Sequence, residues 1–347
     1  STLYTGDGSV INNLSGATFT NTSNAHLYHY YGGTRTAFNN SGTFTKNTAT
    51  GTTTVDTAFN NTGAVIVETG TLALNGGGTS SGTFATSSGA ITQFNSTYHV
   101  TDGSLLSGLG TYQLANGTLT ASGNISVGTF NHTGGALAGT QKFLAGIITW
   151  SGGDWNASTT TAGAPSTIGS GVTLNISGSY RDFDYRAIVN EGTVNWSSGY
   201  LRSGHGGSFT NAAGATFNDL NASGYSIDDA YGQGSVFTNH GTYRRNVTGA
   251  TYIDTVFNNH GTVAIQQGDF YLRGGGSNSA SGVFNTSAGA TVRFTTDYSI
   301  ANGSALTGAG DYHLTGGTLS VSGTINLGTF HQTAGRLAGT QTFASGS

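Results

Sequence analysis

Apolar and polar residues alternate over short stretches of this chain. Val65 and Val67 form one apolar pair on alternate positions, and Leu72 and Leu74 form a second pair after a Gly-containing break. Alternation with a period of two, in short runs that Gly or Asn interrupts, is typical of β-strands. No segment has the apolar period of a helix, and strong helix formers are scarce. The pattern therefore predicts an all-β fold with few helices.

A Gly residue followed by small and then apolar residues recurs along the chain at nearly regular intervals. The motif begins at Gly16, Gly42, Gly63, Gly89 and Gly110, and again at Gly214, Gly241, Gly261, Gly289 and Gly310. Subtracting successive positions within each set gives intervals of 20 to 28 residues. A repeat of this length matches one turn of a β-solenoid. We therefore predict a parallel β-helix with coils of about 20–27 residues.

A much longer repeat runs over these coils. Residues 59–143 are written again at 257–343. The offset grows from 198 (257 − 59) to 200 (343 − 143), so the second copy has two extra residues, which we place in the turn after Gly78 and Gly276. A long repeat built from short strands indicates a stacked solenoid rather than a globule with one catalytic cleft.

The repeat sets the expected domain organisation. We predict one continuous β-solenoid over residues 1–347, with an internal repeat unit at 1–198 and a partial second unit at 199–347. The pattern shows no polar or helical cap at either end, and uncapped solenoid ends expose unpaired strand edges. This favours a fragment of a longer array, or a subunit that stacks end to end on copies of itself.

Stacked coils place like residues on like, because neighbouring strands lie only ~4.8 Å apart. The aromatic residues expected to form inward columns are Phe19, Phe44, Phe59, Phe84, Phe94 and Phe130. Paired asparagines occur at 39–40, 60–61 and 258–259. At the corners of successive coils, their side-chain amides are expected to form hydrogen-bonded ladders.

Composition narrows the classes of function. Only 7% of the residues are charged, the net charge is −4 and no basic run occurs, so we expect no nucleic-acid partner. No apolar stretch approaches the length of a membrane span. The 58 Gly residues suggest disorder, but periodic apolar positions and a single Pro, at 165, oppose it. Cys is absent, and no motif indicates a cofactor.

Three motifs carry a resemblance to a known group of proteins. They are GAVIVETGTLALNGGG at 63–78, the FNN anchors at 59–61 and 257–259, and TWSGGDW at 149–155. These motifs resemble those of repeat-rich bacterial surface proteins of the autotransporter and filamentous-haemagglutinin group, whose exported regions form right-handed parallel β-helices. The resemblance covers nearly the whole chain. It implies this fold and an extracellular location at a bacterial cell surface, but no activity.

The strongest catalytic candidate in the sequence is the segment YRDFDYR at 180–186. On a strand, Asp182 and Asp184 share one face and would both point outward. Two such carboxylates can serve acid/base hydrolysis of a polysaccharide. The alternative is that they pair with Arg181 and Arg186 in a surface charge cluster.

A second acidic pair, Asp228 and Asp229, lies in the Gly-flanked stretch 223–234. Carboxylate and carbonyl oxygens are the ligands that Ca²⁺ prefers, so the pair is a weak metal candidate. Two adjacent Asp residues in a turn are also explained by a solvated loop. We therefore predict no metal site here.

The run HLYHYY at 26–31 is unusually aromatic. Exposed aromatic rings stack on sugar rings, so Tyr28, Tyr30 and Tyr31 are candidates for binding a glycan. The alternative is a loop whose rings cover the core.

These observations favour a structural role over catalysis. We expect an extracellular rod or filament subunit of a bacterial cell surface, with adhesion as a further role and neighbouring copies of the chain as partners. Surface glycans are a second class of partner. The alternatives are a polysaccharide lyase or hydrolase that uses Asp182 and Asp184, and a glycan-binding module that uses the tyrosines.

Overall fold

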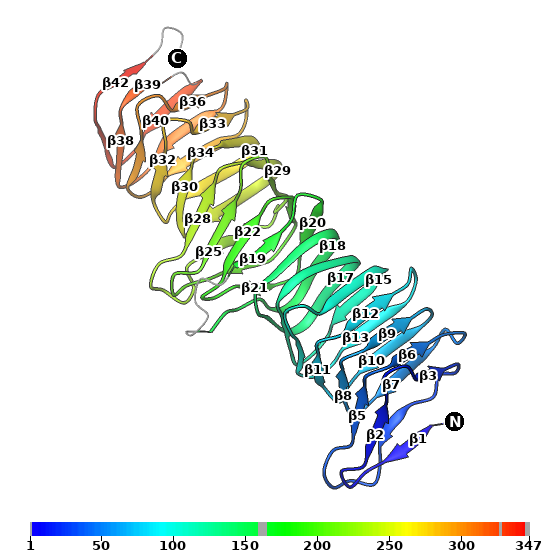
Figure 1. Ribbon diagram of the computed structural model, residues 1–347. Helices are drawn as coiled ribbons and strands as arrows, with labels where there is room; N and C mark the ends of the chain where they lie inside the picture. The colour runs from blue at the N-terminus through cyan, green and yellow to red at the C-terminus, as the bar shows by residue number, and fades with distance from the viewer. Residues whose placement is uncertain (1, 159–164, 326–327, 344–347) are drawn as a thin grey trace. The chain divides into compact units, whose positions relative to one another are not determined.

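The computed structural model describes residues 2–158, 165–325 and 328–343, and every regular element within them is a β-strand (Figure 1). The chain divides into two compact units, 1–156 and 157–347, which we describe separately. The boundary that the internal repeat predicts, after residue 198, lies inside the second unit.

The first unit contains eighteen strands, β1 to β18. They are β1 (Leu3–Thr5), β2 (Val10–Asn13), β3 (Thr18–Asn21), β4 (Leu27–His29), β5 (Ala37–Asn40), β6 (Thr43–Lys46), β7 (Thr52–Val55), β8 (Ala58–Asn61), β9 (Ala64–Val67), β10 (Thr71–Leu74), β11 (Gly78–Ser80), β12 (Thr83–Thr86), β13 (Ile91–Phe94), β14 (Tyr98–Val100), β15 (Leu105–Leu114), β16 (Thr118–Ala121), β17 (Gly123–Ala138) and β18 (Gln141–Asp154).

The described residues of the second unit contain strands β19 to β42. They are β19 (Pro165–Ile168), β20 (Val172–Ile176), β21 (Tyr180–Asp182), β22 (Ala187–Asn190), β23 (Thr193–Trp196), β24 (Tyr200–Arg202), β25 (Ser208–Asn211), β26 (Thr216–Asp219), β27 (Ser226–Asp228), β28 (Val236–Asn239), β29 (Thr242–Ile253), β30 (Val256–Asn259), β31 (Thr262–Leu272), β32 (Gly276–Asn278), β33 (Val283–Thr286), β34 (Thr291–Phe294), β35 (Tyr298–Ile300), β36 (Ala305–Thr307), β37 (Asp311–Leu314), β38 (Thr318–Val321), β39 (Gly323–Ile325), β40 (Thr329–Gln332), β41 (Arg336–Ala338) and β42 (Gln341–Phe343).

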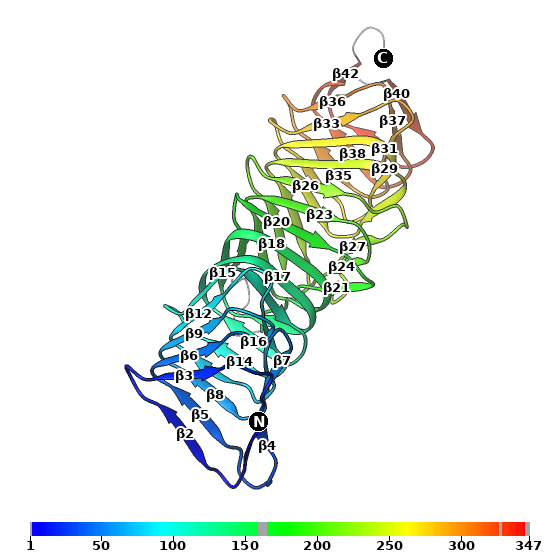
Figure 2. The same ribbon diagram turned by 90° about the vertical axis from the view of Figure 1, so that its right-hand side faces the viewer.

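Each unit is a parallel β-solenoid, as predicted. In the first unit β5 pairs with β8, β6 with β9 and β7 with β10, always in parallel, so three successive strands make one coil. In the second unit β20, β23 and β26 form one such ladder (Figure 2). The register shows that coil length varies: Thr111 lies beside Thr129, 18 residues later, whereas Asn211 bonds Asn239, 28 residues later.

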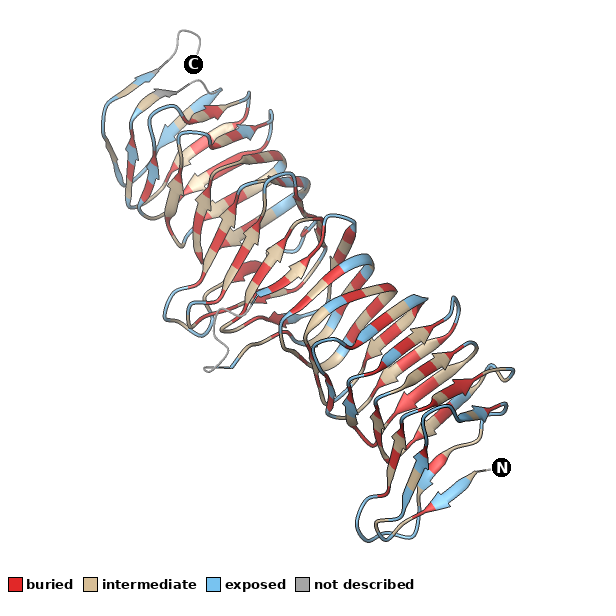
Figure 3. Cartoon of the chain, in the orientation of Figure 1, coloured by how far each residue is buried: buried red, intermediate tan, exposed pale blue. Residues whose placement is uncertain are grey.

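Burial alternates along the strands, as the sequence pattern predicts (Figure 3). Val65, Val67, Leu72 and Leu74 are all buried, whereas Glu68 is exposed. Each coil thus fills its interior with the apolar half of its alternating residues, which is the main source of stability for such a stack.

Aromatic columns link successive coils inside each unit. Phe38 stacks on Phe59 with ring centroids 5.4 Å apart, and Phe237 lies between Phe209 and Phe257 at 5.2 and 5.4 Å. The five phenylalanines of the predicted column set other than Phe19 are fully buried: Phe44, Phe59, Phe84, Phe94 and Phe130. Phe19 stacks on Phe44 but is only half-buried.

The predicted asparagine ladders are present in both units. In the first, Asn13 donates to Asn40, Asn40 to Asn61, and Asn61 to the Ser80 hydroxyl, over 2.7 to 3.2 Å. In the second, the successive members are Asn190, Asn211, Asn239, Asn259 and Asn278, joined at 2.7 to 2.8 Å. These amides are buried, and each row is continuous over the coils that contain its members.

The internal repeat keeps the backbone geometry at its Gly-Gly-Gly corner. Gly78 and Gly276 have φ of 138° and 130°, and a Cβ atom on either would lie 2.1 Å from the carbonyl oxygen of Phe59 or Phe257. Only Gly fits both constraints. The two extra residues of the second copy lie in the turn between β32 and β33, where the sequence placed them.

Candidate functional site

The tyrosines predicted to bind a glycan lie on the surface of the first unit. Tyr28, Tyr30 and Tyr31 are 43%, 62% and 66% exposed. The pairing of β1 with β4 brings a fourth ring beside them, because Tyr4 is the register partner of Tyr28. We call Tyr4, Tyr28, Tyr30 and Tyr31 the tyrosine cluster.

The rings of the tyrosine cluster meet mainly by their edges. Tyr4 lies 5.2 Å from Tyr30 and Tyr30 lies 5.3 Å from Tyr31, both in T-shaped contact. Tyr28 is tilted against Tyr30 at 6.0 Å. No face-to-face stack is formed between these described rings, so each T-shaped contact covers a face of only one of its two rings. The sequence missed Tyr4 because it lies 24 residues from Tyr28 and only the strand register joins them.

The two carboxylates of the catalytic candidate do not share a strand face, which corrects the sequence-based geometry. Strand β21 ends at Asp182, Phe183 is buried, and Asp184 lies in the following turn, where Tyr185 has φ of 57°. Asp182 leaves the outer side of β21, as expected, but it is only 7% exposed because Arg202 and Tyr231 cover it. The alternation rule fails here because the chain turns directly after Asp182.

Both carboxylates have partners other than those expected. Arg202 donates from Nε and Nη2 to the two oxygens of Asp182, each over 2.7 Å, and the Tyr231 hydroxyl donates to Oδ2 over 2.6 Å. Asp184 accepts from Nδ1 of His205 at 3.0 Å. A bidentate, partly buried arginine–carboxylate pair holds the carboxylate in place, which suits a structural role better than proton transfer.

Asp182 and Arg202 belong to a column of charged residues that continues over the following coils. Arg202 is the register partner of both Asp182 and Asp228, and Asp254 follows on the next coil, where Arg273 binds it through two nitrogens. Burial, and then repulsion from Asp254, raise the pKa of Asp228. Hydrogen bonds to Asp182 and Asp254 raise the pKa of Arg202 and Arg273 respectively. The column is an external ion-pair ladder.

Of the weak calcium candidates, Asp228 belongs to this ladder, and Asp229 follows the end of β27. One carboxylate oxygen of Asp229 is buried and has no hydrogen-bond partner among the described residues. Among these residues, however, three or more His, Asp or Glu ligands gather within 4.8 Å only at Asp311, His313 and His331. The acidic pair therefore does not assemble a carboxylate cage of its own.

Cations cover several aromatic rings on the outside of the second unit. The guanidinium of Arg202 lies 4.3 Å from the Tyr180 ring centre, and that of Arg273 lies 4.2 Å from the Tyr252 ring centre. Tyr180 also stacks on Tyr200 at 5.4 Å. These rings are engaged face-on by guanidinium groups or by a stacked ring of the same unit, whereas the rings of the tyrosine cluster contact one another mainly by their edges.

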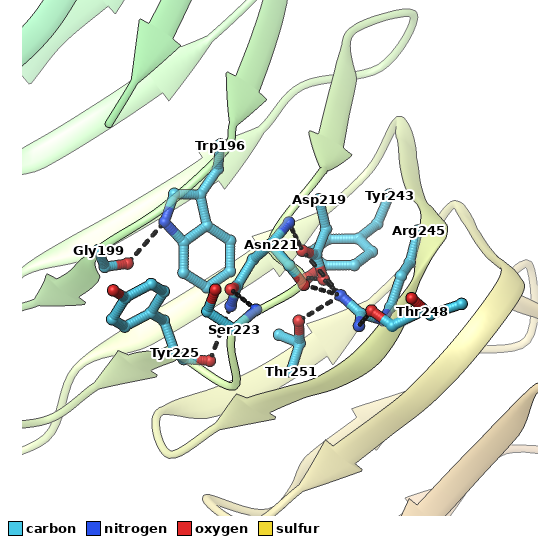
Figure 4. A network of polar contacts seen from close by, with 10 residues as sticks. All are labelled: Trp196, Gly199, Asp219, Asn221, Ser223, Tyr225, Tyr243, Arg245, Thr248 and Thr251. Carbon is cyan, nitrogen blue, oxygen red and sulfur yellow. Dashed lines mark hydrogen bonds and ion pairs between the residues drawn. The ribbon is translucent and has the colours of Figure 1, made fainter. Parts of the chain in front are cut away.

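A buried polar network inside the second unit was not expected from the sequence (Figure 4). Asp219 and Arg245 are fully buried and form an ion pair with both Asp oxygens 3.1 Å from Nη1. The Tyr243 hydroxyl donates to Asp219 at 3.0 Å. Arg245 also donates to the Asn221 carbonyl and to the Thr251 hydroxyl. Burial raises the pKa of Asp219, and Arg245 opposes this rise.

The first unit has a buried cation at the matching position of the repeat. Lys46 is fully buried and donates to the carbonyl of Ala49 at 3.2 Å, and its register partner is Asn21. Burial lowers the pKa of Lys46. The signal for both cations was available in the sequence, since Lys46 and Arg245 occupy inward positions of the alternation, two residues after the buried rings of Phe44 and Tyr243.

The three tryptophans have a packing role. Trp150, Trp155 and Trp196 are at most 1% exposed, and Trp150 meets Trp155 edge to face at 5.4 Å. They therefore offer no face to a sugar.

Comparisons with protein-family models, with curated proteins and with solved structures gave no match to this chain. Within the part of the chain that the structure describes, no helix has the length and apolar character needed to cross a membrane.

Proposed function

We propose that this chain is a non-catalytic structural solenoid of an exported protein at a bacterial cell surface, where it provides a stable scaffold with an adhesive role. The observation that carries the proposal is the buried amide ladder, in which Asn190, Asn211, Asn239, Asn259 and Asn278 join successive coils. Such a ladder serves no reaction, but it fixes the register of each coil on the next.

The ladder gives a physical basis for mechanical and proteolytic resistance. Each inner amide bonds the next amide and a backbone carbonyl; Asn239, for example, also donates to the Thr262 carbonyl at 3.1 Å. Opening one coil would expose several buried polar groups at once. Proteases cut where backbone is exposed and mobile, so a chain paired in this way should resist them.

Composition and one sequence motif support the proposed location. The charge-poor, Cys-free composition and the resemblance of the 63–78 motif to bacterial surface proteins favour export. Assembly of copies end to end is part of the same proposal, because coils with parallel strands can pair with coils of another copy through the same backbone groups.

Native-state proteolysis and electron microscopy test this function. We expect the purified chain to survive proteinase K under native conditions, and an Asn239→Ala variant to be cut faster. Concentration-dependent polymers should appear in micrographs. Rapid digestion of the native chain would remove the scaffold proposal, and strictly monomeric particles at high concentration would remove the assembly proposal.

Glycan binding by the tyrosine cluster is a second candidate, favoured by four exposed rings whose faces are not stacked on each other. Such rings can pack on the apolar faces of sugar rings. A glycan array with the native chain and a Tyr28→Ala variant tests it. Binding that the substitution weakens would support the candidate, and the absence of any bound glycan would remove it.

The hydrolase or lyase alternative has less support, because Arg202 and Tyr231 already hold Asp182. It predicts turnover of a polysaccharide that Asp182→Asn abolishes. Absence of turnover over a broad panel of acidic and neutral polysaccharides would exclude it.

A further inference from the structure

Three potential metal ligands lie together on the outer face of the second unit. Asp311 and His313 are on alternate positions of β37, so both side chains leave the same face of the strand. His331 is the register partner of His313 on the neighbouring strand β40, and the two imidazole rings are 4.5 Å apart. The ligand atoms of all three residues lie within 4.8 Å of one another.

We propose that Asp311, His313 and His331 bind a late first-row divalent metal ion, Zn²⁺ in the first place. Two imidazoles and one carboxylate are a donor set that suits Zn²⁺, Co²⁺ and Ni²⁺, and three protein ligands leave one position for water. Ligands of a tetrahedral Zn²⁺ ion, each about 2.0–2.2 Å from the metal, lie about 3.3 Å from each other. The site therefore closes by at most about 1.5 Å through side-chain rotation, which outward side chains at half-buried and exposed positions allow.

The internal repeat shows that these ligands are not needed for the fold. Subtracting the offset of 200 places Thr111, Gln113 and Asn131 of the first copy at the positions of Asp311, His313 and His331. The inward residues between them are retained: Tyr112 and Tyr312 are both buried, and so are Leu114 and Leu314. Only the outward residues have become metal ligands in the second copy.

Arg293 sits against the site and opposes a cation. Its Nη1 donates to Nδ1 of His313 at 3.2 Å, since a guanidinium can only donate, while its Nη2 donates to Asp269 at 3.2 Å. The first copy has Gln93 at this position (293 − 200). A bound dication must compete with this positive charge, so removal of the charge should strengthen binding.

A bound ion would join two adjacent coils at residues 18 apart in sequence (331 − 313). Because the site exists only when β37 and β40 are paired, metal binding stabilises that pairing. The metal ion thus links two adjacent coils. This role is independent of any catalytic activity and of the proposed scaffold function.

Isothermal titration of the native chain with ZnCl₂, together with Co²⁺ absorption spectroscopy, tests the site. We expect one high-affinity ion per chain, and a rise in the melting temperature with Zn²⁺. Asp311→Thr, His313→Gln and His331→Asn introduce the residues of the first copy, so they should fold, and each should weaken Zn²⁺ binding about tenfold or more. Arg293→Gln should tighten it several-fold.

His260→Thr is the matched control, because it removes a histidine from the His240–His260 stack elsewhere in the second unit and introduces the Thr62 of the first copy. It should leave Zn²⁺ affinity and stoichiometry unchanged. The absence of saturable binding up to millimolar Zn²⁺ would overturn the proposal. So would equal losses in His260→Thr and His313→Gln, or unchanged affinity in all three ligand variants.

Discussion

Asp219 and Arg245 are register partners on adjacent strands of the second unit, 3.1 Å apart and both without solvent exposure. The first copy of the repeat has Asn21 and Lys46 as register partners at the same positions. The inward cation is thus present in both copies, but only the second copy gives it a carboxylate. The internal repeat offers a matched comparison for each of the substitutions below.

Breaking the Asp219–Arg245 pair from one side should be severe. Asp219→Asn leaves a buried guanidinium without its counter-ion, and we expect the free energy of unfolding to fall by about 3–5 kcal/mol. The double variant Asp219→Asn/Arg245→Met, with no buried charge, should recover most of this loss. Urea denaturation of the native chain and of both variants measures these changes in the free energy of unfolding. Equal losses in the single and double variants would contradict this account of the pair.

Replacing Lys46 by Met should stabilise the chain near neutral pH. The substitution removes a buried charge but keeps the apolar stem, and the Ala49 carbonyl retains a hydrogen bond from Thr69. We expect a gain of about 1 kcal/mol in the free energy of unfolding at pH 7. Thermal or urea unfolding of both proteins in the same buffer checks the gain.

Lys46 should also give a pH dependence that Lys46→Met lacks. Burial puts the folded-state pKa below the ordinary value of 10.5, so between these two values the unfolded chain binds more protons than the folded chain. The stability of the native chain therefore rises relative to the variant as pH increases through this window towards 10.5. A difference in stability between the two proteins that stays constant with pH would show that Lys46 is not desolvated.

Asn239→Ala should cost more than a substitution in the outer row of amides. It interrupts the inner ladder, because Asn239 accepts from Asn211 and donates to Asn259 and Thr262 in a buried site. The expected loss is about 1–3 kcal/mol. Asn195→Ala, in a half-buried outer row, is the control and should cost less than about 1 kcal/mol because water replaces the lost contacts. Urea denaturation ranks the two, and a reversed order would refute the ladder's role.

Tyr30→Ala should lower stability only slightly, because the ring is 62% exposed, and should weaken glycan binding. For any glycan that binds the tyrosine cluster, one lost stacking contact is worth about 0.5–1.5 kcal/mol. Tyr180→Ala is the control. Tyr180 is also a surface tyrosine, but it lies outside the tyrosine cluster, and Arg202 and Tyr200 contact its ring. Calorimetry with an array hit distinguishes them, and an equal effect of both substitutions would argue against the cluster.

The sequence by itself determined the architecture, because alternation and coil length are local properties repeated many times. Val65, Val67, Leu72 and Leu74 were correctly placed inside. Asn39, Asn40 and Asn259 were correctly expected to join amide ladders, whereas Asn258 accepts a hydrogen bond from the Ser277 hydroxyl. The same pattern of inward apolar residues recurs in every coil, so the predicted architecture does not depend on any single coil.

Only the tertiary structure decided which outward residues meet. Asp182 and Asp184 were separated by a turn that alternation did not reveal, and Asp182 found its partner in Arg202 on the next coil. Tyr4 joined Tyr28, and His331 joined His313, through strand register. Coils vary from at least 18 to 28 residues, so a sequence offset does not fix which surface residues lie side by side. Inward positions are constrained by the core, whereas outward contacts depend on the length of every intervening turn.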